Sequence, residues 1–260
     1  MTAALEGSRA VITGAARGIG EATARRFCEE GARVLLTDRD GDAVEAAAQR
    51  LRSAGHDASG QVLDVTEEGD VQRVLDGAAD LLGGLDVAVA NAGVLAMNPL
   101  AELSLADFER TLWVNVVGVF LTLKHALPHL RAAGGGTLLC TSSQAGVHGY
   151  RDLSAYCASK FAVVGLVESL AQELAGDGIR VCAVAPGVTE TEMYGELVRE
   201  RARLWGVDEK TAEDRIRNTV PFGRTATPEE IANAFVYLAS PQAAYVSGVA
   251  LVLDAGELSG

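Results

Sequence analysis

Short apolar runs alternate along this chain with longer stretches of helical character. The runs are hydrophobic throughout rather than alternating with polar residues, which is the pattern of strands covered by helices on both faces. Seven runs separated by helices predict an α/β fold with a seven-stranded parallel sheet in a doubly wound arrangement. The expected strands are residues 9–13, 33–37, 62–63, 85–90, 137–141, 179–184 and 249–253.

We expect a single domain over residues 1–260, because no Pro- or Ser-rich linker divides the chain. The segment from about 191 to 224 interrupts the alternation of strand and helix after the sixth strand, and it is charged and helical in character. An insertion at the ligand-binding edge of such a sheet predicts a mobile substrate lid. An oligomer contact or a plain pair of surface helices is the alternative.

A glycine-rich segment, Thr13–Gly20, lies between the first expected strand and the first helix. Glycines there permit a tight turn, and the helix N-terminus favours a pyrophosphate. Asp38, eighteen residues beyond Gly20, ends the second strand at a spacing typical of a carboxylate that binds a ribose 2'-hydroxyl. A 2'-phosphate at about 4 Å would be repelled by about 4 kcal/mol. NAD is therefore expected rather than NADP, although Arg17 and Arg39 could offset the repulsion.

Two further segments follow predicted strands. Asp64-Val65 comes after the third strand, and Asn91-Ala92-Gly93 comes after the fourth. Either segment alone could be an ordinary turn, because Asp, Asn and Gly favour turns. Parallel strands end at the same edge of a sheet, so the two segments are expected to line one groove.

Ser143, Tyr156 and Lys160 form the most specific pattern in the chain. In a helix over residues 154–176, the tyrosine and the lysine are four residues apart and share one face. An ammonium beside the phenol would favour the phenolate, and lowering its pKa from about 10 toward 7 takes roughly 4 kcal/mol. Ser143, thirteen residues before the tyrosine, can donate a hydrogen bond. We therefore expect a tyrosine that acts as a base, with Ser142 as the alternative to Ser143.

These segments together resemble the short-chain dehydrogenase/reductase family, of the single-domain type with a Tyr-x-x-x-Lys element. The resemblance implies a Rossmann-type fold and a catalytic tetrad of Asn115, Ser143, Tyr156 and Lys160. In such a tetrad the tyrosine exchanges a proton with an alcohol or carbonyl while hydride moves to or from a nicotinamide. The resemblance also implies a homotetramer, with helices around residues 107–132 and 154–175 packed across a dimer interface.

The same resemblance extends to Pro186-Gly187-Val188 and Thr191, which would reach the nicotinamide amide and the phosphates. A turn with helix-capping threonines is the alternative for this segment. The residues expected to bind the cofactor are Gly14, Arg17, Gly18, Ile19, Gly20, Asp38, Arg39, Asp64, Val65, Asn91, Ala92, Gly93, Tyr156, Lys160, Pro186, Gly187, Val188 and Thr191.

The candidate pocket residues are mostly apolar with a few directional polar groups, which suits a small secondary alcohol or ketone of cyclic or steroid-like form. His148 is expected on a pocket loop, where an ordinary loop histidine is an equal alternative. An NADPH-dependent carbonyl or 3-oxoacyl reductase is the rival enzyme, and a non-enzymatic NAD-binding sensor is the rival of another class. The substrate candidates are Val94, Leu95, Ser143, Gln144, His148, Met193, Tyr194 and Trp205.

Composition narrows the expected partners and location. The formal net charge of -13 disfavours nucleic acid, whose backbone requires clustered basic residues. The four cysteines form no CxxC pair and the N-terminus is unlike a secretory leader, so a cytoplasmic location is expected. No membrane association is expected, because no apolar stretch reaches about 18 residues. No metal is expected either, because His125 and His129 lack a third ligand.

Overall fold

A computed structural model describes residues 3–259, which fold around one central sheet. All seven strands of this sheet are parallel, in the order β3-β2-β1-β4-β5-β6-β7. The predicted α/β fold with a seven-stranded parallel sheet is therefore confirmed. The strands are β1 (Arg9–Thr13), β2 (Arg33–Asp38), β3 (Ala58–Val62), β4 (Val87–Ala90), β5 (Gly136–Thr141), β6 (Ile179–Pro186) and β7 (Ala250–Leu253).

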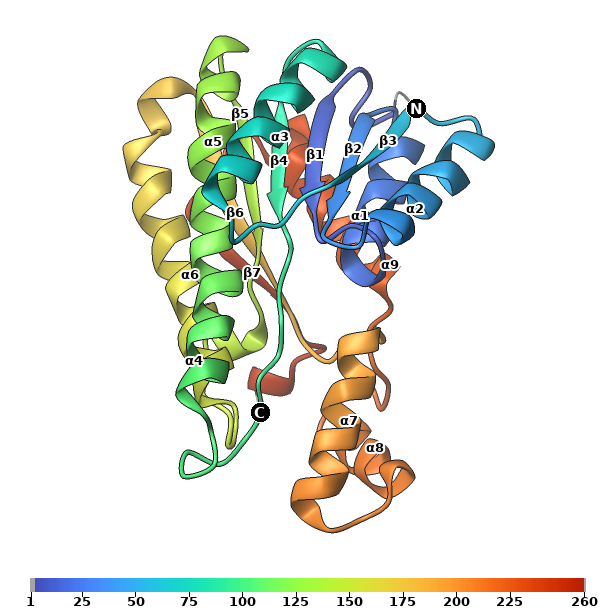
Figure 1. Ribbon diagram of the computed structural model, residues 1–260, viewed down its shortest axis with the longest axis vertical. Helices are drawn as coiled ribbons and strands as arrows, with labels where there is room; N and C mark the ends of the chain where they lie inside the picture. The colour runs from blue at the N-terminus through green and yellow to red at the C-terminus, as the bar shows by residue number, and fades with distance from the viewer. Residues whose placement is uncertain (1–2, 260) are drawn as a thin grey trace.

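Helices cover both faces of the sheet (Figure 1). Phe27 and Phe235 are fully buried between the sheet and the layer of α1, α2 and α9. Leu75 and Leu123 are buried on the opposite face, under α3, α5 and α6. The helices are α1 (Gly18–Glu29), α2 (Gly41–Ser53), α3 (Glu68–Leu82), α4 (Leu105–Leu112), α5 (Gly118–Ala132), α6 (Ser154–Glu173), α7 (Glu192–Trp205), α8 (Glu209–Arg217) and α9 (Pro228–Ala239).

The third strand lies earlier in the chain than the apolar pattern predicts. The expected run was residues 62–63, whereas β3 is Ala58–Val62 and leaves Leu63 just beyond its end. This strand is at the edge of the sheet and pairs only with β2 among residues 3–259. Its side chains are mostly half-buried, with polar Ser59 and Gln61 among them, so they carry no continuous hydrophobic signal.

The helical stretch Leu105–Ala132 is interrupted by a turn of π-helix, Trp113–Val117, between α4 and α5. This stretch is long and apolar enough to cross a membrane, a property that it shares with the buried core helices of globular proteins. Here α5 packs on β4 and β5 inside one of the two large core clusters, and many of its side chains are buried there. Single turns of π-helix often occur at functional sites.

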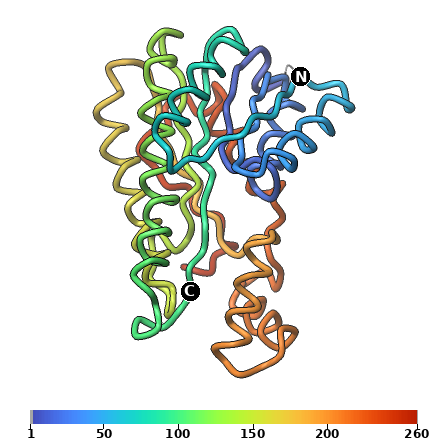
Figure 2. Tube along the Cα trace, in the orientation of Figure 1, coloured from blue at the N-terminus to red at the C-terminus, as the bar shows by residue number. Residues whose placement is uncertain are grey.

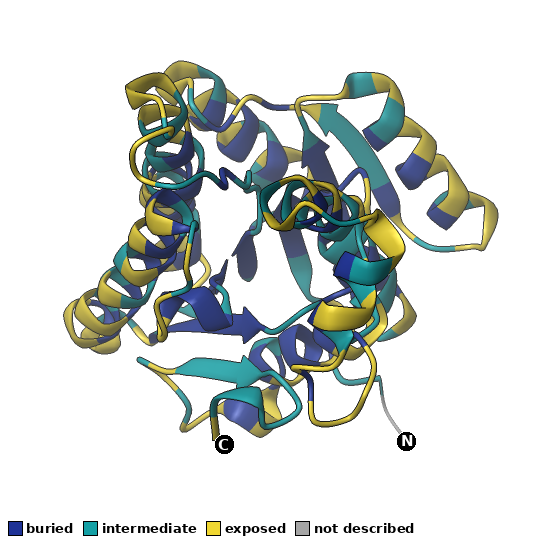
Figure 3. Ribbon diagram, turned by 90° about the horizontal axis from the view of Figure 1, so that it is seen from below, coloured by how far each residue is buried: buried dark blue, intermediate teal, exposed yellow. Residues whose placement is uncertain are grey.

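The insertion between β6 and α9 projects beyond the carboxyl ends of the strands (Figure 1). Figure 2 shows the chain leaving β6, forming α7 and α8, and returning to α9. Two backbone hydrogen bonds close its base, from Glu190 N to Ala226 O and from Ala226 N to Val188 O, each 2.9 Å long. Viewed from below in Figure 3, α7 and α8 are mostly exposed or half-buried, while the central strands of the sheet are mostly buried.

Asn91, directly after β4, holds the ends of three strands together. Its Nδ2 donates to the carbonyls of Thr13 and Gly14, at 3.0 and 2.9 Å. Its Oδ1 accepts from the hydroxyl of Thr141 at the end of β5, at 2.9 Å. The amide therefore satisfies carbonyls that the glycine-rich turn leaves without strand or helix partners.

We expect Asn91→Ala to destabilise the protein by about 2 kcal/mol, because partly buried carbonyls lose their donor. For a chain of this size, that loss corresponds to a fall in melting temperature of about 4–8 °C. Asn218→Ala is the matched control, because Asn218 is exposed and we expect it to change the melting temperature little. Equal melting temperatures for the two variants would contradict this role.

Candidate active site

A cavity of about 1170 Å³ lies at the carboxyl ends of the strands, bounded on its outer side by α7. It takes in the glycine-rich turn, the ends of β2, β4, β5 and β6, and the start of α6. The sequence-predicted residues that line it are Gly14, Arg17, Gly18, Ile19, Asp38, Arg39, Asp64, Val65, Asn91, Ala92, Gly93, Val94, Leu95, Ser143, Gln144, Tyr156, Lys160, Pro186, Gly187, Val188, Thr191, Met193, Tyr194 and Trp205.

Three of the predicted residues lie outside the lining of this cavity: Gly20, Asn115 and His148. Gly20 is buried beneath the turn, and Asn115 is buried behind the cavity wall. His148 is exposed, and its ring packs edge-on against Tyr150 at a centroid distance of 5.2 Å. The structure therefore does not bring His148 into the candidate site, because the loop turns its side chain to the surface.

The glycine-rich turn has the shape required to hold a dinucleotide phosphate. A Cβ atom on Gly14 would come within 2.7 Å of the Ala92 Cα, and one on Gly20 would overlap the Gly14 carbonyl oxygen. Helix α1 begins directly after Arg17, and no side chain caps its N-terminus. Free backbone N–H groups and a close-fitting turn are what a pyrophosphate needs. These residues therefore fit a nicotinamide dinucleotide.

Asp38 is held at the end of β2 by two backbone N–H groups. Its Oδ2 accepts from Ala16 N at 3.2 Å, and its Oδ1 accepts from Asp40 N at 3.1 Å. Arg17, one of the two cations that could offset this carboxylate, forms ion pairs with Asp40 at 2.6 Å and with Glu192 at 2.8 Å. Its charge is therefore compensated by other carboxylates, while Arg39 remains exposed on the cavity rim.

Tyr156 and Lys160 occupy the first turns of α6 and share its inner face, as predicted from their spacing. The Lys160 Nζ lies 5.6 Å from the centre of the Tyr156 ring. The same Nζ donates to the Thr141 carbonyl at 2.8 Å, which fixes the buried ammonium under the floor of the cavity.

The pKa of Tyr156 moves in the direction opposite to the expected one. Burial raises the pKa of the phenol to about 12, while a hydrogen bond with Ser143 acts in the lowering direction. Burial also lowers the pKa of Lys160 to about 8, because a desolvated ammonium favours its neutral form. The sequence argument counted the attraction between the two groups and omitted the cost of taking both out of water. At neutral pH Tyr156 is thus a phenol that can donate a proton.

The structure separates the roles of Ser142 and Ser143. The Ser142 hydroxyl is buried and donates to the Lys160 carbonyl at 3.1 Å, so it ties β5 to α6. Ser143 lines the cavity, and its Oγ accepts from Ala145 N at 3.1 Å at the start of the short helix Gln144–Gly146. Ser143 is the serine that a substrate can reach.

Asn115 sits within the π-helical turn and is fully buried. Its side chain exchanges hydrogen bonds with the backbone of Val94, at 2.8 Å from Val94 N and 2.9 Å to Val94 O. Its Nδ2 also donates to the Ser159 hydroxyl at 3.0 Å. Asn115 therefore positions the cavity wall at Val94 and the helix that carries Tyr156 and Lys160.

Several cavity residues were missed from the sequence, including residues on α7 and on the loop before α6. On α7, the missed Leu197 and Arg201 lie at four-residue intervals between Met193 and Trp205, which were predicted, and all four line the cavity. This helical spacing was a usable signal that the sequence interpretation did not follow. The other lining residues outside the predicted set are Asp40, Leu63, Thr66, Arg110, Val114, Thr141, Ala145, Tyr150, Arg151, Leu153, Thr189, Glu192, Glu196, Ile216, Thr219 and Glu257.

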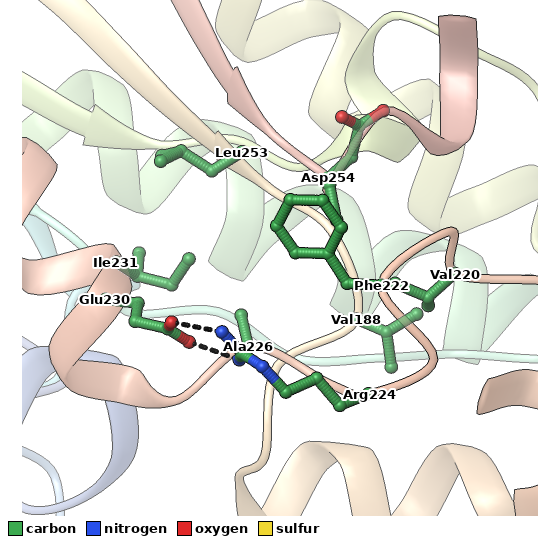
Figure 4. A pocket seen from close by; sticks show the side chains of 10 residues that line it. Val188, Val220, Phe222, Arg224, Ala226, Glu230, Ile231, Leu253 and Asp254 are labelled. Carbon is green, nitrogen blue, oxygen red and sulfur yellow. Dashed lines mark hydrogen bonds and ion pairs between the residues drawn. The ribbon is translucent and has the colours of Figure 1, made fainter. Parts of the chain in front are cut away.

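A smaller hollow lies on the other side of the segment that leads into α7 (Figure 4). Arg224 forms a two-pronged ion pair with Glu230 there, at 2.8 and 2.6 Å. This pair lowers the pKa of Glu230 to about 2, and Glu230 also completes the N-terminal capping of α9 through Thr227. The Arg224–Glu230 ion pair therefore holds the end of the insertion against the start of α9.

Known proteins share this sequence and arrangement. A family model described as Enoyl-(Acyl carrier protein) reductase matches residues 14–257. Cis-4-hydroxycyclohexanecarboxylate dehydrogenase of Sinomonas cyclohexanicum is 42% identical over 251 residues, covering 95% of each chain. A crystal structure of a short-chain type dehydrogenase/reductase from Mycobacterium marinum superposes with a TM-score of 0.90 at 36% identity, covering 100% of this chain and 98% of that one. This chain belongs to the short-chain dehydrogenase/reductase family.

A second crystal structure, described as an NAD(P)-dependent gluconate 5-dehydrogenase from Beutenbergia cavernae, has NADP bound at low occupancy. It superposes with a TM-score of 0.91 at 34% identity and covers 100% of both chains. The short-chain dehydrogenase/reductase described here is accordingly an oxidoreductase that acts on CH–OH groups with a nicotinamide cofactor. Within residues 3–259, no cluster of metal-ligating side chains accompanies this site.

We expect Ser143→Ala to lower turnover by about 10- to 100-fold, because the hydroxyl that reaches the cavity can stabilise the substrate oxygen. Ser142→Ala is the matched control: it should keep turnover within about threefold of the wild type and lower the melting temperature by a few degrees. Steady-state kinetics and thermal unfolding measure the two effects. A larger loss of turnover in Ser142→Ala would reverse the assignment.

Proposed function

We propose that this protein is an NAD-dependent dehydrogenase that interconverts a cyclic, largely apolar secondary alcohol and its ketone. The observation that carries the proposal is the position of Tyr156, Lys160 and Ser143 in the wall of a cavity whose other end is the glycine-rich turn. A nicotinamide cofactor bound to that turn supplies or accepts the hydride. Tyr156 gives a proton to the carbonyl oxygen in reduction and takes it from the alcohol in oxidation.

The other members of the tetrad hold this proton transfer in place. Ser143 donates to the substrate oxygen, which aligns that oxygen with the Tyr156 hydroxyl. Lys160 is fixed by the Thr141 carbonyl, at 2.8 Å, so its charge acts at a constant position next to the phenol. Asn115 holds α6 at a fixed position relative to the cavity wall at Val94, because it bonds both Ser159 on α6 and the Val94 backbone.

NAD is preferred because the ribose end of the cavity is acidic. Asp38 offers its carboxylate to a 2'-hydroxyl, and Arg17 is already paired with Asp40 and Glu192. A 2'-phosphate would need Arg39 alone to offset the repulsion from Asp38. The NADP-bound relative and the reductase description of the family model favour the alternative, an NADPH-dependent carbonyl or 3-oxoacyl reductase.

The substrate end suits an apolar ring. Leu95, Val114, Leu153, Met193 and Leu197 line this part of the cavity. The cyclohexane ring in the name of the Sinomonas relative supports a cyclic alcohol. Helices α7 and α8 act as a lid over this end, because the insertion is closed at its base and packs mainly on itself.

The enzyme is a cytoplasmic homotetramer in this proposal. Trp113, Phe120 and Phe161 are 54%, 45% and 47% exposed on the two helical stretches expected at the dimer interface. Large aromatic side chains exposed on neighbouring helices are typical of an interface core. The four cysteines are all free and buried, which suits a reducing compartment.

We expect Asp38→Asn to reduce the preference for NAD over NADP by at least about tenfold, because it removes the charge that repels a 2'-phosphate while keeping the shape of the side chain. The ratio of kcat/KM for the two cofactors measures this preference. Arg17→Gln serves as the comparison. If the Arg17 guanidinium bound a 2'-phosphate, removing it would lower kcat/KM for NADP. An unchanged ratio in Asp38→Asn would show that Asp38 does not contact the ribose.

Tyr156→Phe should lower turnover by at least about a hundredfold and leave NADH binding nearly unchanged. Tyr237→Phe is the control with normal turnover, because the Tyr237 side chain is exposed on the outer face of α9. Because burial raises the pKa of Tyr156 to about 12, wild-type alcohol oxidation should become faster as pH rises toward about 12, since more of the phenol is ionised at each step. Carbonyl reduction, which uses the protonated phenol, should lack this rise. An oxidation rate independent of pH, or near-normal turnover in Tyr156→Phe, would refute the assigned role.

A further inference from the structure

Arg201 is the only basic side chain of α7 in the cavity wall, among the residues that the structure describes. It lies between Leu197 and Leu204 on the helix face that packs against the cluster containing Tyr150 and Tyr156. Its position is therefore in the substrate half of the cavity, away from the glycine-rich turn. A largely buried charge beside apolar side chains needs a partner or a function.

The Arg201 guanidinium is buried but incompletely bonded. Its side chain is 12% exposed, and it makes two hydrogen bonds within residues 3–259, to Asp152 Oδ2 at 3.3 Å and to the Arg151 carbonyl at 3.0 Å. An arginine has five N–H donors, so three are available to a ligand. The indole of Trp205 lies 5.4 Å away and holds the plane of the guanidinium.

Charges around this guanidinium do not balance. Asp152 lies between Arg201, at 3.3 Å, and Arg151, whose Nε is 3.7 Å from the other carboxylate oxygen. Two guanidiniums share one carboxylate, which leaves one positive charge uncompensated. Both arginines line the cavity, whereas Asp152 does not. The surplus charge therefore faces the space that a substrate would occupy.

Asp152 is placed so that it orients Arg201. Its backbone has a φ of 66°, which is uncommon for a residue other than glycine, and its carbonyl accepts from Asn98 N at 2.9 Å. Unfavourable backbone conformations of this kind persist where the surrounding structure holds them, and they cluster at ligand sites. Among the carboxylates that line the cavity on this side, Glu192 pairs with Arg17, and Glu257 accepts hydrogen bonds from Gln144 and Thr219. Glu196 on α7 also lines the cavity, but its side chain is exposed and forms no ion pair with Arg201.

We infer that Arg201, with Arg151 beside it, binds a carboxylate on the substrate, so that the alcohol oxidised at Tyr156 belongs to a cyclic hydroxy acid. This inference rests on the proposed function and adds the acid group and the residue that selects it. One surplus positive charge matches one carboxylate, and the planar fork of an arginine matches its two oxygens. The apolar side chains between Arg201 and Tyr156 then contact the ring that separates the acid from the alcohol.

Comparing 4-hydroxycyclohexanecarboxylate with its methyl ester tests the assignment. The wild type should have a kcat/KM at least about tenfold higher for the acid, because the ester cannot form a charge-assisted pair. Arg201→Gln should raise KM for the acid at least about tenfold while changing that for the ester less than about threefold. Arg201→Lys, which keeps the charge, should recover part of the preference for the acid.

Arg203→Gln is the matched control for a purely structural role of α7. Arg203 lies on the same helix outside the cavity, and it joins the helix to Asn98 Oδ1 at 2.7 Å. This variant should change KM for acid and ester equally, and by less than about threefold. If Arg201→Gln also changes both substrates equally, Arg201 only fastens the helix and the inference is overturned.

A measurement on the wild type keeps the test independent of how the variants fold. Cyclohexanecarboxylate should inhibit oxidation of a neutral cyclohexanol at least about tenfold more strongly than cyclohexanecarboxamide, and equal inhibition would overturn the inference. Failure of the proposed function is distinguishable, because then neither acid, ester nor neutral cyclohexanol would support hydride transfer. If the enzyme oxidises the neutral alcohols but shows no preference for the acid, the proposed function stands and only the role of Arg201 in binding a carboxylate is overturned.

Discussion

The side chain of Asn91 joins parts of the molecule that the sheet alone would leave separate. Its amide binds the carbonyls of Thr13 and Gly14 and accepts from Thr141, so the ends of β1, β4 and β5 meet at one group. The Thr141 carbonyl in turn fixes the Lys160 ammonium. The glycine-rich turn and the proton-transfer residues thus share one rigid support, and the distance between cofactor and substrate sites depends on it.

Burial away from water has the largest effect on the pKa values of Tyr156 and Lys160 in this site. Taking Tyr156 and Lys160 out of water raises the pKa of the phenol to about 12 and lowers that of the ammonium to about 8. Both groups are therefore displaced toward their neutral forms. The centre is consequently built as a proton donor at neutral pH, and its use as a base requires alkaline conditions or added positive charge nearby.

Helix α7 connects the two ends of the cavity through its charged side chains. Glu192 in its first turn pairs with Arg17 beside the glycine-rich turn, and Arg201 near its other end pairs with Asp152 beside α6. The first pair compensates the charge of Arg17 at the ribose end, and the proposed preference for NAD depends on this pair. In the second pair, Arg201 shares Asp152 with Arg151, and the inferred carboxylate site rests on this shared carboxylate. One helix can thus influence the choice of both ligands.

The sequence by itself determined the α/β class, the parallel sheet and the segments that line the cavity, because buried strands require continuous apolar runs and glycine turns leave a recognisable spacing. It misplaced β3, whose edge position needs no continuous apolar face, and it placed His148 in a pocket that its side chain turns away from. Only the tertiary structure decided the pKa values of Tyr156 and Lys160, the division of roles between Ser142 and Ser143, and the position of Arg201. Burial and pairing depend on contacts between segments far apart in the chain, such as Asp152 with Arg201, and local residue patterns carry no record of those contacts.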